Sequence, residues 1–280
     1  MTSTNQDPQP QDDSAAGEKK PLREFLFSLP GLIVTTVVAG VASWAVTYLT
    51  TAMETWGKDA EPVVTVSVET NPAKIGGFSD QSIVGVVPIG TRPATGPGEG
   101  CSAFHDWLTT NDGVDAGKSK LQIAVQGSSS QQVQINNLRV IVVKRDKPPP
   151  SVGLTCPSAG SANLRPIDID LDQALPRAKY KAKDGRPFGF TVNEGEIETF
   201  LVTALAKHAR YAWYLELDVT SEGKTSTLRV DNKGKPFRTA PLPNSPMWSW
   251  DYNSSWTGSD KRLRVGEVFI QPTPSKGSAG

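Results

Sequence analysis

An uninterrupted uncharged segment, residues 25–53 (from Phe25 to Met53), constrains this chain more than any other feature. None of its 29 residues is Asp, Glu, Lys, Arg or His, and residues 32–49 are mostly apolar. A helix needs about 20 mostly apolar residues to cross the hydrocarbon core of a bilayer. We therefore expect residues 25–53 to form a transmembrane helix that anchors the chain in a lipid bilayer.

Basic residues in the flanks of this segment indicate its orientation. Lys19, Lys20 and Arg23 precede it, whereas Lys58 is the only basic residue in the first 20 positions after it. Cytoplasmic flanks are enriched in Lys and Arg, so we expect a cytoplasmic N-terminus. A cleaved signal peptide is the alternative, but its apolar core would be only about 7–15 residues long.

The segments on either side of the predicted helix differ in composition. Residues 1–24 are rich in Gln, Asp, Ser, Pro and Thr. Because such a segment buries little apolar surface, we expect a disordered cytoplasmic tail. We expect an extracytoplasmic domain over residues 57–270 and a second disordered tail over 271–280. Residues 57–280 carry 26 basic and 23 acidic side chains, a balance that does not favour a nucleic-acid partner.

Apolar and polar residues alternate along much of the extracytoplasmic segment, which is typical of half-buried strands. The clearest run is residues 210–220. In residues 133–144 the pair Asn136-Asn137 interrupts the alternation and indicates a bulge, while the prolines at 148–150 indicate a crossover between sheets. Roughly ten strands favour an all-β fold, an antiparallel β-sandwich, in addition to the transmembrane helix. The one short helical turn we expect lies around residues 104–108.

Both cysteines, Cys101 and Cys156, lie in the extracytoplasmic segment, 55 positions apart. This separation is unlike the close spacing of metal and redox motifs. An even number of cysteines in an oxidising compartment favours a disulfide. Two free thiols are the alternative, and would follow from the opposite membrane topology.

Motifs that would carry catalysis are sparse. The two histidines, His105 and His208, are 103 positions apart, and the chain contains no GxSxG or HExxH motif. We expect His105 in a surface loop and His208 in a hairpin turn. The sequence therefore predicts a protein that is not an enzyme and needs no cofactor.

Three carboxylates in the sequence DIDLD, Asp168, Asp170 and Asp172, alternate along a predicted strand. Carboxylates on one face of a strand could bind calcium. However, an EF-hand loop that began at Asp168 would need Gly and Glu where the chain has Gln173 and Lys179. Cross-strand ion pairs with nearby lysines are the simpler interpretation, and we expect no metal site here.

An aromatic cluster near the C-terminus is the best candidate for a ligand or partner surface. Trp248, Trp250, Tyr252 and Trp256 lie in the sequence SPMWSWDYNSSW, among small polar residues. Alternating aromatic side chains could form a platform for sugar rings or an anchor for a protein. The alternative is that they pack onto the sandwich as a cover for one sheet.

Three segments together resemble the sequences of one group of proteins: GVDAGKSKLQIAVQG, VQINNLRVIVVKRDKPP and YAWYLELDVTSEGKTSTLRVDNKGKPFRT. They are similar to a group of uncharacterised single-pass membrane proteins from high-GC Gram-positive bacteria. The resemblance covers roughly residues 113–240 and carries no known activity. It implies a bacterial plasma membrane anchor and an extracytoplasmic β domain, and argues against N-glycosylation of Asn253.

These observations predict a non-catalytic interaction module, anchored in the plasma membrane and presented at the cell surface. Its expected partner is an unknown extracytoplasmic protein. The alternative is a cell-wall glycan-binding module that uses the aromatic cluster as its platform.

Overall fold

The computed structural model describes residues 63–75, 83–99, 101, 103–157, 165–182, 184–251 and 255–274. The expected cytoplasmic tail at 1–24, the expected transmembrane helix at 25–53 and residues 275–280 lie outside these ranges. Within the ranges, no helix combines the length and the apolar character needed to cross a membrane. The described residues belong to the segment for which the sequence predicts a β domain, except for residues 271–274, which belong to the expected C-terminal tail.

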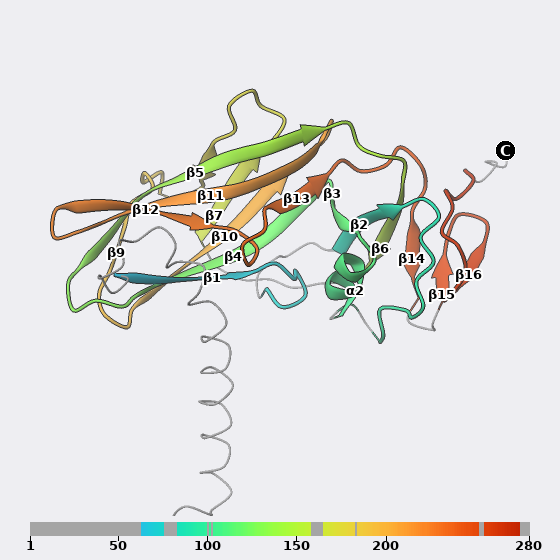
Figure 1. Ribbon diagram of the computed structural model, residues 1–280, viewed down its shortest axis with the longest axis horizontal. Helices are drawn as coiled ribbons and strands as arrows, with labels where there is room; N and C mark the ends of the chain where they lie inside the picture. Colours follow the sequence, from blue (N-terminus) through green and yellow to red (C-terminus); the bar gives the residue numbers. More distant parts are fainter. Residues whose placement is uncertain are drawn as a thin grey trace, which may run out of the picture. The chain divides into compact units, whose positions relative to one another are not determined.

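Most of the described chain is β-strand, arranged in two hydrogen-bonded sheets (Figure 1). The smaller sheet has the order β1 (Val64–Glu69), β4 (Lys118–Gly127), β10 (Ile197–Leu205), β7 (Arg165–Asp170) and β8 (Ala178–Tyr180). The larger sheet has the order β16 (Arg262–Arg264), β15 (Ser255–Thr257), β14 (Trp248–Trp250), β6 (Ser151–Cys156), β2 (Ile83–Pro88), β3 (Val114–Ala116), β13 (Phe237–Ala240), β11 (Arg210–Ser221), β5 (Val133–Asp146) and β9 (Phe190–Val192), with β12 (Lys224–Val230) paired to β11. The prediction of an all-β domain is confirmed.

The main hydrophobic core lies between the smaller sheet and the part of the larger sheet around β5 and β11. Strand β11 shows how the sequence produces it. Trp213, Leu215 and Leu217 are fully buried, whereas the intervening Tyr214 and Glu216 are only half-buried. Because successive side chains point to opposite faces of a strand, one face of β11 enters the core. Burying each large apolar side chain contributes about 1.5–3 kcal/mol, which makes this alternation the main determinant of the sandwich.

The long pairing of β5 with β11 contains a bulge where the sequence predicts one. Asp218 pairs with Asn137, but the next residue, Val219, pairs with Ile135, so Asn136 is an extra residue on β5. The predicted bulge is therefore confirmed. A second register shift lies nearer the other end of the same strand pair. Bulges increase local twist, which helps a strand of 14 residues to follow the curved sheet.

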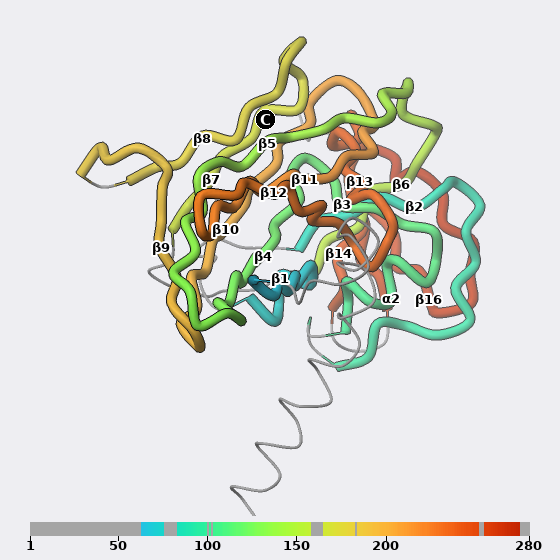
Figure 2. The backbone as a smooth tube through the Cα atoms, turned by 60° about the vertical axis from the view of Figure 1, so that its left-hand side comes forward, coloured from blue at the N-terminus to red at the C-terminus, as the bar shows by residue number. Residues whose placement is uncertain are grey.

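A second, smaller core lies at one end of the molecule, in a part that we call the end lobe. The end lobe comprises β2, β6, β14, β15, β16 and the helix α2 (Phe104–Thr110). Figures 1 and 2 both show it at the opposite end from β9. The helix forms where the sequence predicts a helical turn, and buries Phe104, Trp107 and Leu108. The end lobe is thus a tryptophan-rich extension of the larger sheet.

Two details of the predicted sandwich are wrong. The sheets are mixed rather than antiparallel, because the pairs β7–β10, β3–β13 and β6–β14 are parallel. Alternation identifies which residues face inward, but carries no information about the direction of the neighbouring strand. The described residues form sixteen strands rather than about ten, and six of these have only three residues. Such short strands are below the length at which alternation can be recognised.

Candidate functional site

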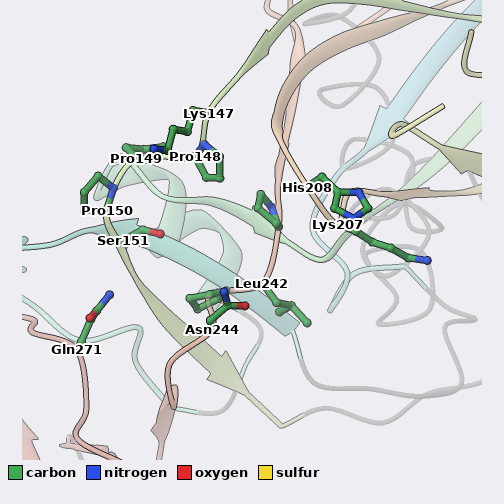
Figure 3. Close-up of a pocket in the computed structure, with 12 residues that line it drawn as sticks. Lys147, Pro148, Pro149, Pro150, Ser151, Lys207, His208, Leu242, Asn244 and Gln271 are labelled. Carbon is green, nitrogen blue, oxygen red and sulfur yellow. The ribbon is translucent and has the colours of Figure 1, made fainter. Parts of the chain in front are cut away.

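An open groove of about 700 Å³ lies where the sandwich connects to the end lobe (Figure 3). Four segments line it: the link between β5 and β6, the turn between β10 and β11, the segment that follows β13, and the segment that follows β16. The lining residues are Lys147, Pro148, Pro149, Pro150, Ser151, Lys207, His208, Pro241, Leu242, Pro243, Asn244 and Gln271. Because these loops are distant in sequence, only folding brings them together.

Five of the twelve lining residues are prolines, which make the groove walls stiff. Proline fixes its own φ near −65° and lacks a backbone N–H, so it ends strand pairing. Pro148–150 accordingly separate the end of β5 from the start of β6, and the carbonyl of Pro150 accepts a hydrogen bond from the N–H of Ile89 at 3.4 Å. The predicted crossover between sheets is wrong in one respect: β5 and β6 belong to the same sheet. Stiff walls reduce the ordering cost when a ligand binds.

The β10–β11 turn is fastened to the sandwich by Asp172. Its carboxylate accepts hydrogen bonds from the backbone N–H groups of Lys207 at 2.7 Å and His208 at 3.1 Å. It also accepts one from the Tyr211 hydroxyl at 2.7 Å, and lies 3.4 Å from Nδ1 of His208. The Asp172 side chain is only 12% exposed, although its donors Lys207 and His208 lie at the surface. These contacts hold one wall of the groove in place.

The same contacts perturb the acidity of both partners. Burial alone would raise the pKa of Asp172, but the hydrogen bonds from Tyr211, Lys207 and His208 outweigh it and lower the pKa below its ordinary value. Burial and the neighbouring carboxylate raise the pKa of Tyr211 to about 12. Near neutral pH, therefore, Asp172 is ionised and Tyr211 stays a hydrogen-bond donor.

The groove carries positive charge on two sides. Figure 3 shows Lys147 beside the proline wall and Lys207 on the opposite side, where its side chain extends away from the prolines. Within the described part of the chain, neither side chain has a carboxylate partner within 4 Å, and none of the twelve lining residues is acidic. Pro241, Leu242 and Pro243 add an apolar stretch to the lining. Figure 3 shows Leu242 between the proline wall and the side that carries His208. The Leu242 side chain is 51% exposed and accessible to a ligand.

The geometry of the groove suits binding. Ser151 and His208 are the two lining side chains that could form a nucleophile and base pair. Figure 3 shows them on opposite sides of the groove rather than in contact. The amides of Asn244 and Gln271 are exposed and can form hydrogen bonds with a backbone or a polar ligand.

The aromatic cluster that the sequence singles out lies elsewhere. Trp248, Trp250 and Trp256 are 0%, 3% and 0% exposed and form the centre of the end lobe, while Tyr252 lies outside the described residues. The indole N–H of Trp248 donates to the carbonyl of Ile270, at 2.8 Å. The Trp250 and Trp256 rings pack 5.0 Å apart, centre to centre. The structure therefore places these indoles in the interior, where a sugar ring cannot stack on them.

The two cysteines lie together in the end lobe. The sulfurs of Cys101 and Cys156 are at disulfide distance, with their Cα atoms 5.7 Å apart. Cys156 ends strand β6, and Cys101 lies just before α2. The pair therefore ties the helix to the sheet, and the predicted pairing is confirmed as a structural contact.

His105 is not the surface loop residue that the sequence predicts. It lies in α2, is 5% exposed, and its Nε2 is 3.3 Å from a carboxylate oxygen of Asp115 on β3. Burial alone would lower the pKa of His105, but attraction to Asp115 and their hydrogen bond outweigh it and raise the pKa. The prediction is wrong because Phe104 and Leu108 draw this face of α2 into the core.

The three alternating carboxylates do not gather into one site. Asp172 fastens the β10–β11 turn, whereas Asp168 is 57% exposed on β7, with Lys179 opposite it and the Lys181 amine 4.0 Å away. This is the cross-strand arrangement that the sequence favours. No group of three or more His, Cys, Asp or Glu side chains in the described residues is placed to hold a metal ion.

Comparison with known proteins adds no functional assignment. No protein-family model matches the chain, and no curated protein matches it. The groove was not identified from the sequence, although the proline clusters at 148–150 and 241–243 were visible there. The sequence of neither cluster indicates that the two lie close together in space.

Proposed function

We propose that this protein is a membrane-anchored, non-catalytic interaction module at the cell surface. Its extracytoplasmic β domain would bind a protein partner through the proline-walled groove. The observation that carries this proposal is the groove itself: an open, stiff-walled surface of about 700 Å³ with an accessible leucine at its centre. Stiff, pre-formed surfaces with an apolar centre and a polar rim are typical of protein-binding sites.

The groove favours a protein over a glycan as the occupant. Sugar rings are bound by stacking on aromatic faces, but none of the twelve lining residues is Phe, Tyr or Trp. The indoles of Trp248, Trp250 and Trp256, on which the glycan alternative depends, are buried. The polar groups at the rim, including Asn244 and Gln271, can instead pair with the backbone of a polypeptide.

Site-specific photo-crosslinking in intact cells tests this proposal. A photoreactive residue at Leu242 is expected to give one discrete crosslinked protein. The matched control is Leu175, which is 77% exposed and does not line the groove, and it should not give that product.

A product from Leu242 that disappears on digestion of cell-wall glycan, but resists protease, would support the glycan alternative instead. Identical products from both positions, or none from Leu242, would contradict the proposal.

A further inference from the structure

We propose that the groove recognises an extended peptide segment with acidic residues at its ends and apolar residues in its middle. This inference rests on the proposed function, because it names the chemistry of the protein segment that would occupy the same groove. It follows from the order of side chains across the groove: a lysine on one side, an apolar centre, and a lysine and a histidine on the other.

The charges of the groove are available to a ligand. Lys147 and Lys207 are exposed, and within the described residues their ammonium groups have no acidic side chain within 4 Å. His208 differs, because its Nδ1 already faces Asp172 at 3.4 Å. A ligand carboxylate near either lysine would therefore gain an ion pair without displacing one that exists in the protein. Exposed pairs of this kind each contribute little, about a two- to fivefold change in affinity.

The centre of the groove requires a different kind of contact. Pro241, Leu242 and Pro243 form a short apolar stretch, and the 51% exposed Leu242 side chain can be covered by an apolar ligand residue. The prolines have no N–H to offer, whereas the side-chain amides of Asn244 and Gln271 at the rim can form hydrogen bonds. An extended peptide presents backbone groups to such amides and side chains to the leucine. An anionic polymer without apolar groups would use the lysines but leave the centre uncovered.

Binding of synthetic peptides to the full-length chain, purified in detergent, tests this inference. The probe is an eight-residue peptide with two glutamates at each end and an alternating leucine and alanine middle, followed by fluorescence anisotropy. We expect it to bind more tightly than a peptide with the same middle and lysines at both ends. We also expect it to bind more tightly than a glutamate-ended peptide with a glycine and serine middle.

Substitutions in the groove give the second measurement. Lys147→Gln and Lys207→Gln should each weaken binding of the acidic peptide about two- to fivefold, and the loss should shrink as salt screens the charges. The control variant is Lys224→Gln, at an exposed position of β12 that does not line the groove, and it should bind like the wild-type chain.

Equal binding of the acidic and basic peptides, or unchanged binding by both lysine variants, would overturn the inference. So would tighter binding of poly(glycerol phosphate) than of the peptide, because an anionic polymer would then be the better ligand. The crosslinking experiment keeps the two proposals separate. A protein captured at Leu242 together with no preference for acidic peptides would leave the proposed function intact and remove only this inference.

Discussion

The contacts of Asp172 predict a specific loss of stability for the variant Asp172→Asn. The carboxylate accepts three hydrogen bonds: His208 N–H and the Tyr211 hydroxyl bond to Oδ1, and Lys207 N–H bonds to Oδ2. Asparagine has nearly the same shape but only one side-chain oxygen. If that oxygen replaces Oδ1, the amide NH₂ faces the N–H of Lys207, and two donors oppose each other.

The size of the loss follows from these bonds. A hydrogen bond to a charged group contributes about 1.5–3 kcal/mol to stability and a neutral one about 1 kcal/mol. In Asp172→Asn the two bonds to Oδ1 become neutral and the bond from Lys207 is lost. The free energy of unfolding should therefore decrease by at least about 2 kcal/mol. The exposed position of Lys207 allows water to satisfy its N–H, which places the expected value near this lower limit. For a domain of this size, each kcal/mol lowers Tm by about 2–4 °C, so we expect a decrease of about 4–8 °C.

The loss should also depend on pH, with a sign set by the lowered pKa of Asp172. A carboxyl whose pKa is lower in the folded state stabilises the fold above its unfolded pKa of about 3.9. That contribution disappears as the pH falls through the folded pKa. The difference in Tm between the wild-type chain and Asp172→Asn should therefore be full at pH 7 and smaller near pH 3.

Thermal unfolding of the purified full-length chain, followed by near-ultraviolet circular dichroism of the buried tryptophans, measures this difference. Asp168→Asn is the matched control, because Asp168 is 57% exposed and the amine of Lys181 is as far as 4.0 Å from its carboxylate. An exposed change of this kind should alter stability by less than about 0.5 kcal/mol. A Tm loss in Asp172→Asn no larger than in Asp168→Asn, or one that grows toward pH 3, would refute the reasoning.

Three further predictions concern the rest of the chain. The pKa of His105 is raised in the folded state, so the contribution of His105 to stability is present below its unfolded pKa of about 6.5 and is lost as the pH rises through the folded pKa. The Tm of the wild-type chain should therefore decrease over that pH range. The Tm of His105→Gln should decrease less, as measured by thermal unfolding. Replacing Cys101 and Cys156 by Ala should lower the free energy of unfolding by about 4 kcal/mol, because the bond closes a loop of 55 residues; equal stability of the wild-type chain with and without reductant would contradict this. A reporter enzyme that is active only outside the membrane should be active when fused after Gly280, and an inactive fusion would contradict the expected orientation.

Local patterns predicted much of the fold but little of the candidate site. The alternation along β11 and the bulge at Asn136 were recognisable because both depend on neighbours in the sequence. The parallel pairs and the three-residue strands were not, since both depend on which distant strand lies alongside. The burial of His105 was missed for the same reason: a single histidine carries no sign of the Asp115 carboxylate that it meets in space.

The sequence by itself predicted the strand-rich character of the domain and the pairing of its two cysteines, and it also predicts the anchor segment. Hydropathy and period-two alternation are properties of consecutive residues, and two cysteines allow only one intramolecular pair. The direction of the strands, the interior position of Trp248, Trp250 and Trp256, and the groove itself required the tertiary structure. Each depends on contacts between segments that lie far apart in the sequence, such as Asp115 and Thr239, which pair although they are 124 positions apart. Which segments come into contact depends on how the whole core packs, because the buried faces of all strands must be covered at the same time.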